Sequence, residues 1–527
     1  MCRDAAVARP TPRQGRRPSL PGLRGTSKVY HRTNHMIRTP WKVAAVAAVL
    51  TAVAGAVLYA AGLRIVLDGG GGMSVRFVES AESRADEIAR HREEQRAALD
   101  PTAPPALAVE AAPAPQETGA TVTPAAVGVP ADDTTAAAPL PPSYWTDFRG
   151  PERDGHYREQ PVRLDWPAGG LRPIWKQPAG GGYASFVIAR GRAFTIEQRG
   201  AQEVAAAYDV LTGRELWTNR WTAAFRESMG GDGPRATPTW DEGRLYVLGG
   251  QGELRVLDED TGNMIWRTNI LQDAGADNLP WGMAASPLIV DDTVVVLPGG
   301  QNGRSIVAYD KRTGTSAWSA LDDRQSYSSP MLVTLGGVRQ ILVFSATRLM
   351  GVTPERGELL WEFPWKTSYD VNASQPIVLG ENRVFVSTGY GTGAAVIELT
   401  RSGSRFTVRE VWRNIRMKNQ FTSSLLHEGY IYGLDESILA CVNAETGELM
   451  WKGGRYGYGQ VMLTGGHLIV LTEDGNLVLV RATPDRHEEI VRFPALDGKT
   501  WNHPAMAYGY LLVRNLKEMA AYDLRRP

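Results

Sequence analysis

The chain has 527 residues, with 57 Lys plus Arg balanced by 57 Asp plus Glu, and only 2 Cys. The zero net charge argues against a wholesale nucleic-acid binder, which needs a basic excess. Cys2 and Cys441 cannot supply a disulfide framework, a Cys-based zinc site or a C-x-x-C-H haem attachment. A chain of this length holds either several domains or one large repeat architecture.

The N-terminal region predicts a membrane anchor. Residues 1–42 contain ten basic residues and one acid, so the rest of the chain has a net charge of about minus nine. Residues 43–63 contain no charge, and at about 1.5 Å per helical residue they span a hydrocarbon core of about 30 Å. We therefore predict a single-pass transmembrane helix at 43–63, with a cleaved signal peptide as the alternative.

The basic tail sets the expected topology. The positive-inside rule places it in the cytoplasm and the acidic body across a bacterial inner membrane, in the periplasm or an equivalent extracytoplasmic space. Met36 is a second possible translation start, so the tail comprises either 1–42 or only 36–42. Residues 64–100 are expected to form an exposed, largely helical stalk. Residues 101–142 contain 13 Ala and 10 Pro, which predicts an extended linker without a packed core.

A repeat fills the body, residues 143–527. Its pattern is Ala-x-Asp-x-x-Thr-Gly-x-x-x-Trp, with a clear copy at 207–217, AYDVLTGRELW. The Trp position recurs every 39 to 52 residues, which is the size of a four-stranded propeller blade. The seven structural tryptophans, expected to pack between neighbouring blades, are Trp175, Trp217, Trp266, Trp318, Trp361, Trp412 and Trp451.

The number of first strands predicts eight blades of four antiparallel strands, an all-β fold preceded by the transmembrane helix. Each blade begins with a short apolar strand after a small residue or Pro, as in ASPLIV at 285–290. The ends of the body complement each other. MAAYDL at 519–524 has the Ala-x-Asp strand without a Trp, and Trp175 ends a repeat that has no beginning. We expect these two strands to share one blade and close the ring.

These motifs resemble the pyrroloquinoline-quinone (PQQ)-like propeller family. The opening YWTDFRGPERDG at 144–155 and the stretch at 418–451 are similar to a branch of membrane-anchored or exported bacterial proteins. The family includes eight-bladed quinoprotein alcohol dehydrogenases and the propeller lipoprotein of the outer-membrane β-barrel assembly machinery. The resemblance covers nearly all of 144–527 and implies the fold, whereas enzymes and scaffolds share that fold.

The resemblance implies what a dehydrogenase would need: PQQ stacked on a Trp, a vicinal disulfide, calcium held by Glu and Asn, and an Asp base. The lone Cys441 rules out the vicinal disulfide. A ligand would lie on the ring axis, on loops that join the outer strand of one blade to the first strand of the next. Candidate residues on these loops are Arg235, Trp281, Tyr327, Asp370, Asn372, Lys418, Asn419, Tyr458, Asn502 and His503.

Among these candidates, Trp281 suits stacking on a planar cofactor, and Asp370 with Asn372 suits a calcium ion. The competing interpretation of each residue is a polar loop side chain that binds its own backbone or water. We predict an extracytoplasmic propeller that scaffolds or binds envelope proteins, with no catalytic residues, cofactor or metal. The alternative is a PQQ- and calcium-dependent dehydrogenase that oxidises alcohols or sugars.

Overall fold

The computed structural model describes residues 40–67, 72–77, 79–98, 144–227 and 229–526. The basic tail before Pro40, including Met36, and the Ala/Pro-rich segment 101–142 lie outside the described residues. The chain divides into two units, Met1–Ala61 and Gly62–Pro527.

The first unit contains one described helix, α1 (Pro40–Ala60). Its sequence repeats Ala and Val, and its large apolar side chains are exposed, including Leu50 at 63% and Val57 at 61%. In the described part of the chain, no helix meets the combined length and apolarity of a membrane span. Leu63, predicted to end the apolar helix, begins a strand instead.

The second unit begins with a hairpin and a helix. Strands β1 (Leu63–Leu67) and β2 (Met73–Phe77) pair antiparallel, and α2 (Ala81–Ala97) follows. The Ser80 side chain caps α2 by accepting a hydrogen bond from the backbone N–H of Ser83 at 3.0 Å.

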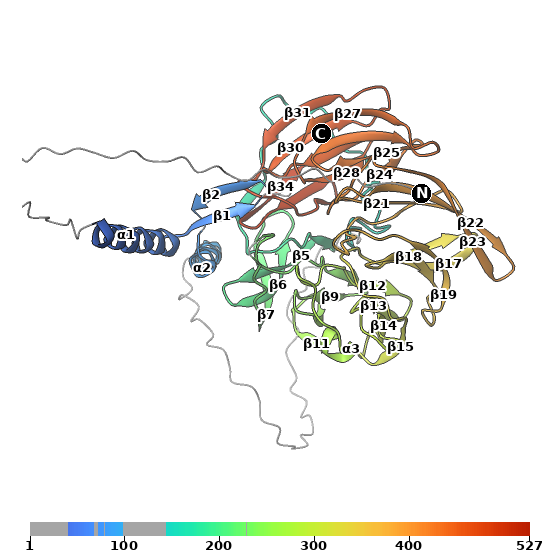
Figure 1. Ribbon diagram of the computed structural model, residues 1–527, viewed down its shortest axis with the longest axis horizontal. Coiled ribbons are helices and arrows are strands. Elements are labelled where there is room, and N and C mark those ends of the chain that lie inside the picture. The colour runs from blue at the N-terminus through green and yellow to red at the C-terminus, as the bar shows by residue number, and fades with distance from the viewer. Residues whose placement is uncertain (1–39, 68–71, 78, 99–143, 228, 527) are drawn as a thin grey trace, which may run out of the picture. The chain divides into compact units, whose positions relative to one another are not determined.

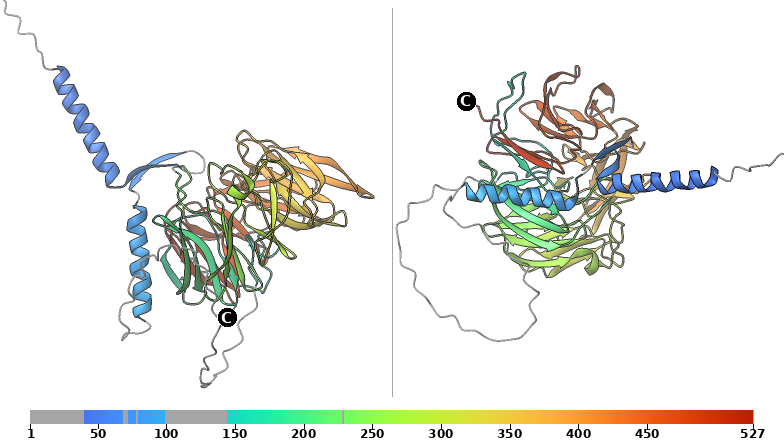
Figure 2. Two further views of the ribbon diagram at one scale, coloured as in Figure 1. Left: turned by 90° about the horizontal axis from the view of Figure 1, so that it is seen from below. Right: turned by 90° about the vertical axis from the view of Figure 1, so that its left-hand side faces the viewer.

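Helix α2 docks on the propeller, unlike the exposed stalk that the sequence predicts (Figure 2). Its Ile88 and Arg92 are buried, at 1% and 3% exposure. The Arg92 guanidinium donates to the side chain of Gln177 at 2.7 Å and the carbonyl of Pro178 at 3.0 Å, and lies 3.5 Å from Glu215. The abundance of charge in 75–98 suggests a solvated helix, but this buried arginine can be identified only with the propeller in place.

Eight four-stranded sheets form the body, and they follow one another around the ring in chain order (Figure 1). Blade 1 contains β4 (Val187–Ala189), β5 (Arg192–Arg199), β6 (Gln202–Asp209) and β7 (Glu215–Thr222), and blade 2 contains β8 (Thr239–Asp241), β9 (Arg244–Leu248), β10 (Glu253–Asp258) and β11 (Met264–Asn269). Blade 3 contains β12 (Leu288–Val290), β13 (Thr293–Val296), β14 (Ile306–Asp310) and β15 (Ser316–Ala320), and blade 4 contains β16 (Met331–Leu335), β17 (Val338–Phe344), β18 (Arg348–Val352) and β19 (Leu359–Pro364). A short helix, α3 (Ile270–Ala274), follows β11.

The second half of the ring has the same organisation. Blades 5 to 8 contain β20 (Ile377–Leu379), β21 (Arg383–Thr388), β22 (Gly393–Ser402) and β23 (Arg405–Asn414); β24 (Leu425–His427), β25 (Tyr430–Asp435), β26 (Ile438–Asn443) and β27 (Leu449–Arg455); β28 (Gln460–Thr464), β29 (His467–Leu471), β30 (Asn476–Arg481) and β31 (Glu489–Pro494); β32 (Ala505–Ala507), β33 (Tyr510–Arg514), β34 (Glu518–Asp523) and β3 (Trp175–Pro178). The predicted eight-bladed propeller is confirmed.

The ring closes as predicted. Blade 8 has the strand order β3-β34-β33-β32, so its outer strand comes from the beginning of the body and its other three strands from the end. Trp175 lies opposite Ala521 in the β3–β34 ladder. The two ends of the body thus share one blade, which closes the ring and leaves only the short edges of the separate blades.

The repeat motif joins neighbouring blades, as it does between blades 2 and 3. The Trp266 indole N–H donates to the carbonyl of Lys311 at 3.2 Å, and its ring covers Gly314 in the following hairpin turn. That turn is held by Asp310, whose carboxylate accepts from the backbone N–H of Thr313 at 2.8 Å. The apolar core likewise lies between blades: Val187 and Phe194 of blade 1 share a cluster with Leu245 of blade 2.

The motif glycine can be tested by substitution. Gly314 has a φ of +75°, and a Cβ there would lie 2.6 Å from the Trp266 ring. Gly303 has a φ of +76° but open space around it. We expect Gly303→Ala to cost about 1 kcal/mol of unfolding free energy from backbone strain alone, and Gly314→Ala clearly more. Urea denaturation checks this, and equal losses would show that the Trp–Gly contact contributes nothing.

Candidate functional site

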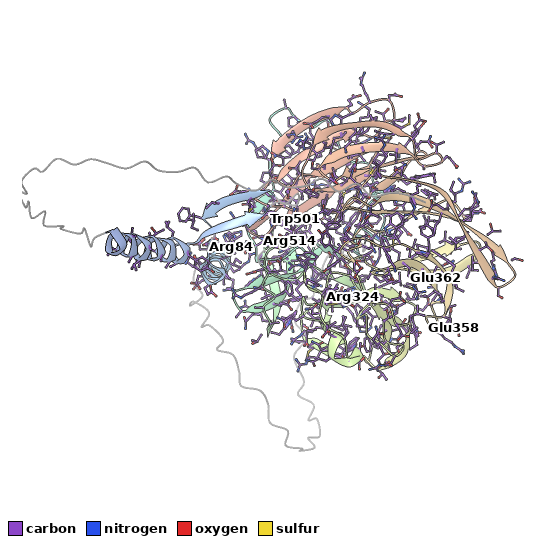
Figure 3. The ribbon with its side chains drawn as sticks, in the orientation of Figure 1. Arg84, Arg324, Glu358, Glu362, Trp501 and Arg514 are labelled. Carbon is purple, nitrogen blue, oxygen red and sulfur yellow. The ribbon has the colours of Figure 1, made fainter. Side chains whose placement is uncertain are left out.

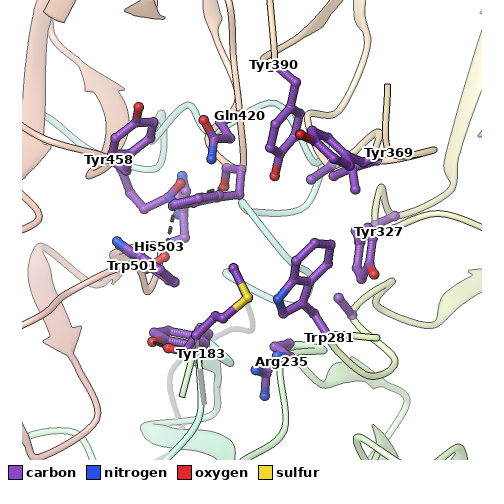
Figure 4. Close-up of a pocket in the computed structure, with 18 of the residues that line it drawn as sticks. Tyr183, Arg235, Trp281, Tyr327, Tyr369, Tyr390, Gln420, Tyr458, Trp501 and His503 are labelled. Atoms are coloured by element: carbon purple, nitrogen blue, oxygen red, sulfur yellow. Dashed lines mark hydrogen bonds between the residues drawn. The ribbon is translucent and has the colours of Figure 1, made fainter. Parts of the chain in front are cut away.

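A pocket of about 770 Å³ lies on the ring axis (Figure 4). All eight blades contribute to it, together with the segment before blade 1. The lining residues are Phe148, Tyr183, Met229, Gly230, Arg235, Trp281, Ala284, Tyr327, Ser329, Tyr369, Val371, Ala373, Tyr390, Gln420, Phe421, Glu436, Tyr458, Gln460, Trp501 and His503.

One repeat position supplies a lining residue from every blade. It lies shortly before each first strand, four residues ahead in seven blades and two residues ahead in blade 7. In chain order the eight residues are Tyr183, Arg235, Ala284, Tyr327, Ala373, Phe421, Tyr458 and Trp501. Five are aromatic, so the repeat itself builds an aromatic ring around the axis.

A chain of hydroxyl groups fixes these positions from one blade to the next. The backbone N–H of Ser185 donates to the Thr237 hydroxyl at 2.9 Å, and the N–H of Thr237 donates to the Ser286 hydroxyl at 3.0 Å. The Ser286 N–H then donates to the Ser329 hydroxyl at 2.9 Å. Each of these residues follows an axial position by two, so the axial side chains are held by buried hydrogen bonds between blades.

One wall of the pocket is a continuous row of aromatic rings. Trp501 lies between Phe421, with centroids 4.4 Å apart, and Tyr183, at 5.1 Å. The Arg235 guanidinium then lies 5.5 Å from the Tyr183 ring centroid. The Trp501 indole N–H donates to Glu473 at 2.9 Å. This wall is rigid because its members pack on and bind one another.

The facing wall is more open. Trp281 and Tyr327 have centroids 5.8 Å apart, and Tyr369 and Tyr390 form a second pair at 5.5 Å. Figure 4 shows these four rings across the pocket from Trp501 and Tyr183. Tyr369 is 68% exposed, a large exposed fraction for a tyrosine that touches another ring. Small residues at the axial positions 284 and 373 leave space beside this wall.

Two pocket residues have a backbone conformation that glycine usually adopts. Tyr390 has a φ of +56° and Glu436 a φ of +60°. The corresponding turns after the second strands of blades 2 and 7 use Gly252 and Gly475 at positive φ. A left-handed conformation costs a non-glycine residue about 1–2 kcal/mol. Eleven other non-glycine residues of the described chain share this conformation, so it is a feature of the turns rather than a mark of the site.

The segment before blade 1 closes the floor. Phe148 lines the pocket, and its ring contacts His503 at a centroid distance of 5.9 Å. Below it, Arg153 donates to the carbonyl of Pro330 at 2.9 Å and pairs with Asp147 at 2.9 Å. Arg149 donates to the carbonyl of Ser424 at 3.0 Å. The YWTDFRGPERDG motif is therefore a plug that fastens several blades at the axis.

The charged groups near the pocket are mostly engaged. Burial lowers the pKa of Arg149 to about 10, so this guanidinium stays positive at neutral pH. Arg235 holds the neighbouring loop by donating to the carbonyl of Gly231 at 2.7 Å. Glu436 is the carboxylate among the described lining residues, and Lys418 lies 3.9 Å from it.

The structure brings some predicted residues together and separates others. Arg235, Trp281, Tyr327, Tyr458 and His503 line the pocket. The remaining candidates are not lining residues, and hydrogen bonds or ion pairs within the protein engage them: Asp370, Asn372, Lys418, Asn419 and Asn502.

The asparagine candidates brace the fold. Asn372 is fully buried, donates to the carbonyl of Ser345 at 2.8 Å and accepts from the Thr388 hydroxyl at 2.8 Å. Asn419 is also fully buried and donates to the carbonyl of Leu434 at 3.1 Å. With both ends of the Asn372 amide occupied, its oxygen does not suit a calcium ligand.

The other oxygen proposed for calcium is also engaged. Asp370 lies 3.2 Å from Arg324 in an ion pair. Within the described ranges, no three His, Cys, Asp or Glu residues gather as a metal site would require. The donor set proposed for calcium therefore does not fit that ion.

Sequence reasoning missed much of the aromatic lining. Tyr183, Phe421 and Trp501 belong to the same repeat position as the predicted Arg235, Tyr327 and Tyr458, so aligning the first strands identifies them. Tyr369, Tyr390 and Glu436 lie in loops whose lengths vary between blades, and the sequence offers no signal for them.

Comparison with known proteins agrees with this fold. Residues 200–453 match the family model described as outer membrane protein assembly factor BamB. The predicted resemblance is confirmed. No curated protein matches the sequence.

Several solved structures are similar. A europium-containing methanol dehydrogenase is 12% identical with a TM-score of 0.51, over 72% of this chain and 91% of that one. A quinohemoprotein alcohol dehydrogenase from Pseudomonas putida is 12% identical with a TM-score of 0.50, over 73% and 80%. BamB from Moraxella catarrhalis is 15% identical with a TM-score of 0.48, over 67% and 99%. At these identities the likeness to the two dehydrogenases establishes the propeller fold alone.

Proposed function

We propose that this protein is a membrane-tethered, extracytoplasmic scaffold that binds a partner protein of the cell envelope through the axial pocket. The observation that supports it most is the composition of that pocket. Trp, Tyr and Arg dominate the energetics of protein interfaces, and here they surround an open space at the centre of a rigid ring. The partner would insert a protruding segment with apolar or aromatic side chains between the two aromatic walls.

Two further observations support an envelope location. The stretch 43–63 has no charge, the large side chains of α1 are exposed, and the basic residues lie on its N-terminal side. The matching family model is described as an outer membrane protein assembly factor, and this description supports an envelope location.

The dehydrogenase remains the second candidate because Trp281 is on the pocket wall, where a planar cofactor would stack. Against it stand the engaged oxygens of Asn372 and Asp370 and the lone Cys441.

Site-specific photo-crosslinking in a cell of the native host tests the scaffold. A photoreactive residue at Tyr369, the exposed tyrosine of the open wall, should give one discrete protein adduct. The matched control is a photoreactive residue at Tyr430, which does not line the pocket. Tyr430 begins β25, and the pocket residue Glu436 follows the opposite end of that strand. Adducts at both positions or at neither would contradict a partner in the pocket.

Cofactor reconstitution tests the alternative, dehydrogenase function. The purified protein is mixed with PQQ and calcium, and dye reduction is followed with a panel of alcohols and sugars. We expect no turnover and no retained cofactor after gel filtration. Alcohol-dependent dye reduction that is lost in Trp281→Ala would overturn the scaffold proposal in favour of the dehydrogenase.

A further inference from the structure

The β1–β2 hairpin has one apolar face. The register pairs Leu63 with Phe77, Ile65 with Val75, and Leu67 with Met73. Because successive residues of a strand alternate between faces, Met73, Val75 and Phe77 share one side of β2.

The apolar face is uncovered on β2. Met73 is 77% exposed, Val75 is 64% exposed and Phe77 is 65% exposed. Burying a side chain of this size contributes about 1.5–3 kcal/mol of free energy. Covering all three side chains would therefore stabilise the hairpin substantially. A two-stranded hairpin is marginally stable in water without a partner for its apolar face. The hairpin therefore needs a surface to lie on.

The position of the hairpin in the chain indicates which surface. It follows α1 after two residues, and α1 has exposed apolar side chains over most of its length. If α1 inserts into a bilayer, a hairpin joined to its end by two residues lies at the level of the lipid headgroups, which is where an amphipathic element binds.

We infer that the β1–β2 hairpin lies flat on the lipid bilayer, with Met73, Val75 and Phe77 in contact with acyl chains. Phe is one of the residue types that interfacial amphipathic elements bury at the boundary between headgroups and acyl chains. The hairpin would then fix the height of α2 and the propeller above the membrane, rather than leaving them on a free tether. This inference rests on the proposed membrane anchoring.

The test compares neighbouring residues that point to opposite faces. An environment-sensitive fluorophore is attached to Val75→Cys or to Ser74→Cys in the full chain, with Cys2 replaced by Ser. Cys441 is fully buried, and burial raises its pKa to about 12, so it should not react. The protein is reconstituted into vesicles of phosphatidylethanolamine and phosphatidylglycerol that contain lipid-bound quenchers.

We expect the probe at 75 to be blue-shifted and quenched by the lipid quenchers, and the probe at 74 to be quenched by aqueous iodide. Equal iodide quenching at both positions would overturn the inference. A blue-shifted probe at 75 that the lipid quenchers do not reach would also overturn it, because it would indicate a protein surface.

Alkaline carbonate extraction of the same vesicles separates the two proposals. If the chain is extracted, the anchoring itself fails. If the chain stays with the lipid while the probe at 75 remains in water, only the hairpin inference fails.

Discussion

Lowering the pH from about 5 to about 2 is expected to reduce the unfolding free energy of the propeller by about 3 kcal/mol through one residue, Glu197. Burial disfavours the charge on this carboxylate, but Arg199 and Arg514 outweigh that effect and lower its pKa to about 2. Arg199 lies 2.6 Å away and Arg514 lies 3.7 Å away, and both are largely or fully buried.

The sign follows from the direction of the shift. In the unfolded chain Glu197 has the ordinary pKa of a glutamate, which is higher than in the folded protein. The stabilisation is therefore complete above the unfolded pKa and is lost as the pH falls through the folded pKa. Acid unfolding should be promoted by this residue.

Glu197→Gln should reveal this contribution in urea titrations followed by tryptophan fluorescence. The variant should lose about 3–5 kcal/mol of unfolding free energy at neutral pH, because it leaves two buried arginines with one carboxylate fewer. Its unfolding free energy should also fall less steeply between about pH 5 and pH 2. Glu355→Gln, on an exposed turn, is the control and should keep the original slope. An unchanged slope in Glu197→Gln would refute the assignment.

Cutting the Ala/Pro-rich segment is expected to leave the N-terminal part bound to the propeller. The binding comes from α2, whose Arg92 reaches Gln177, Pro178 and Glu215, and whose Ile88 is buried. A specific protease site inserted at residue 120 makes the cut possible. After cleavage, the two fragments should co-elute in gel filtration in mild detergent.

Arg92→Ala should abolish this co-elution, because it removes two hydrogen bonds to the propeller and the ion pair with Glu215, which keeps its ion pair with Arg199. The matched control is Arg90→Ala on the same helix, since Arg90 is exposed. Fragments that separate without any substitution would mean that α2 is not held by these contacts.

The propeller fold could be predicted from the sequence because the same turn and strand spacing recurs in most blades. Asp310, Gly314 and Trp318 show why: one turn sets the spacing between Asp and Gly, and one strand sets the spacing from Gly to Trp. The closure of the ring also followed from an incomplete repeat at each end.

The site was only partly predictable. Trp281 and Tyr458 lie in the loops where an axial ligand was expected, and both line the pocket. Asn372 and Asn419 have side chains that could bind a ligand, but each amide donates a hydrogen bond to a backbone carbonyl and holds the fold together. The sequence shows which residue types occupy a loop, and the three-dimensional contacts decide whether they are free.

Blade 8 combines strands from both ends of the body, so its assembly must wait for the last strand to be synthesised. Domains on a growing chain fold as their segments leave the ribosome, from the N-terminus onward. Here β3 is among the earliest strands of the body, and its partner β34 is the last. Until synthesis reaches Asp523, the inner edge of β3 has no neighbour and the ring stays open. The propeller therefore matures only after translation of the body has finished, and a premature stop before Glu518 removes the strand between β3 and β33.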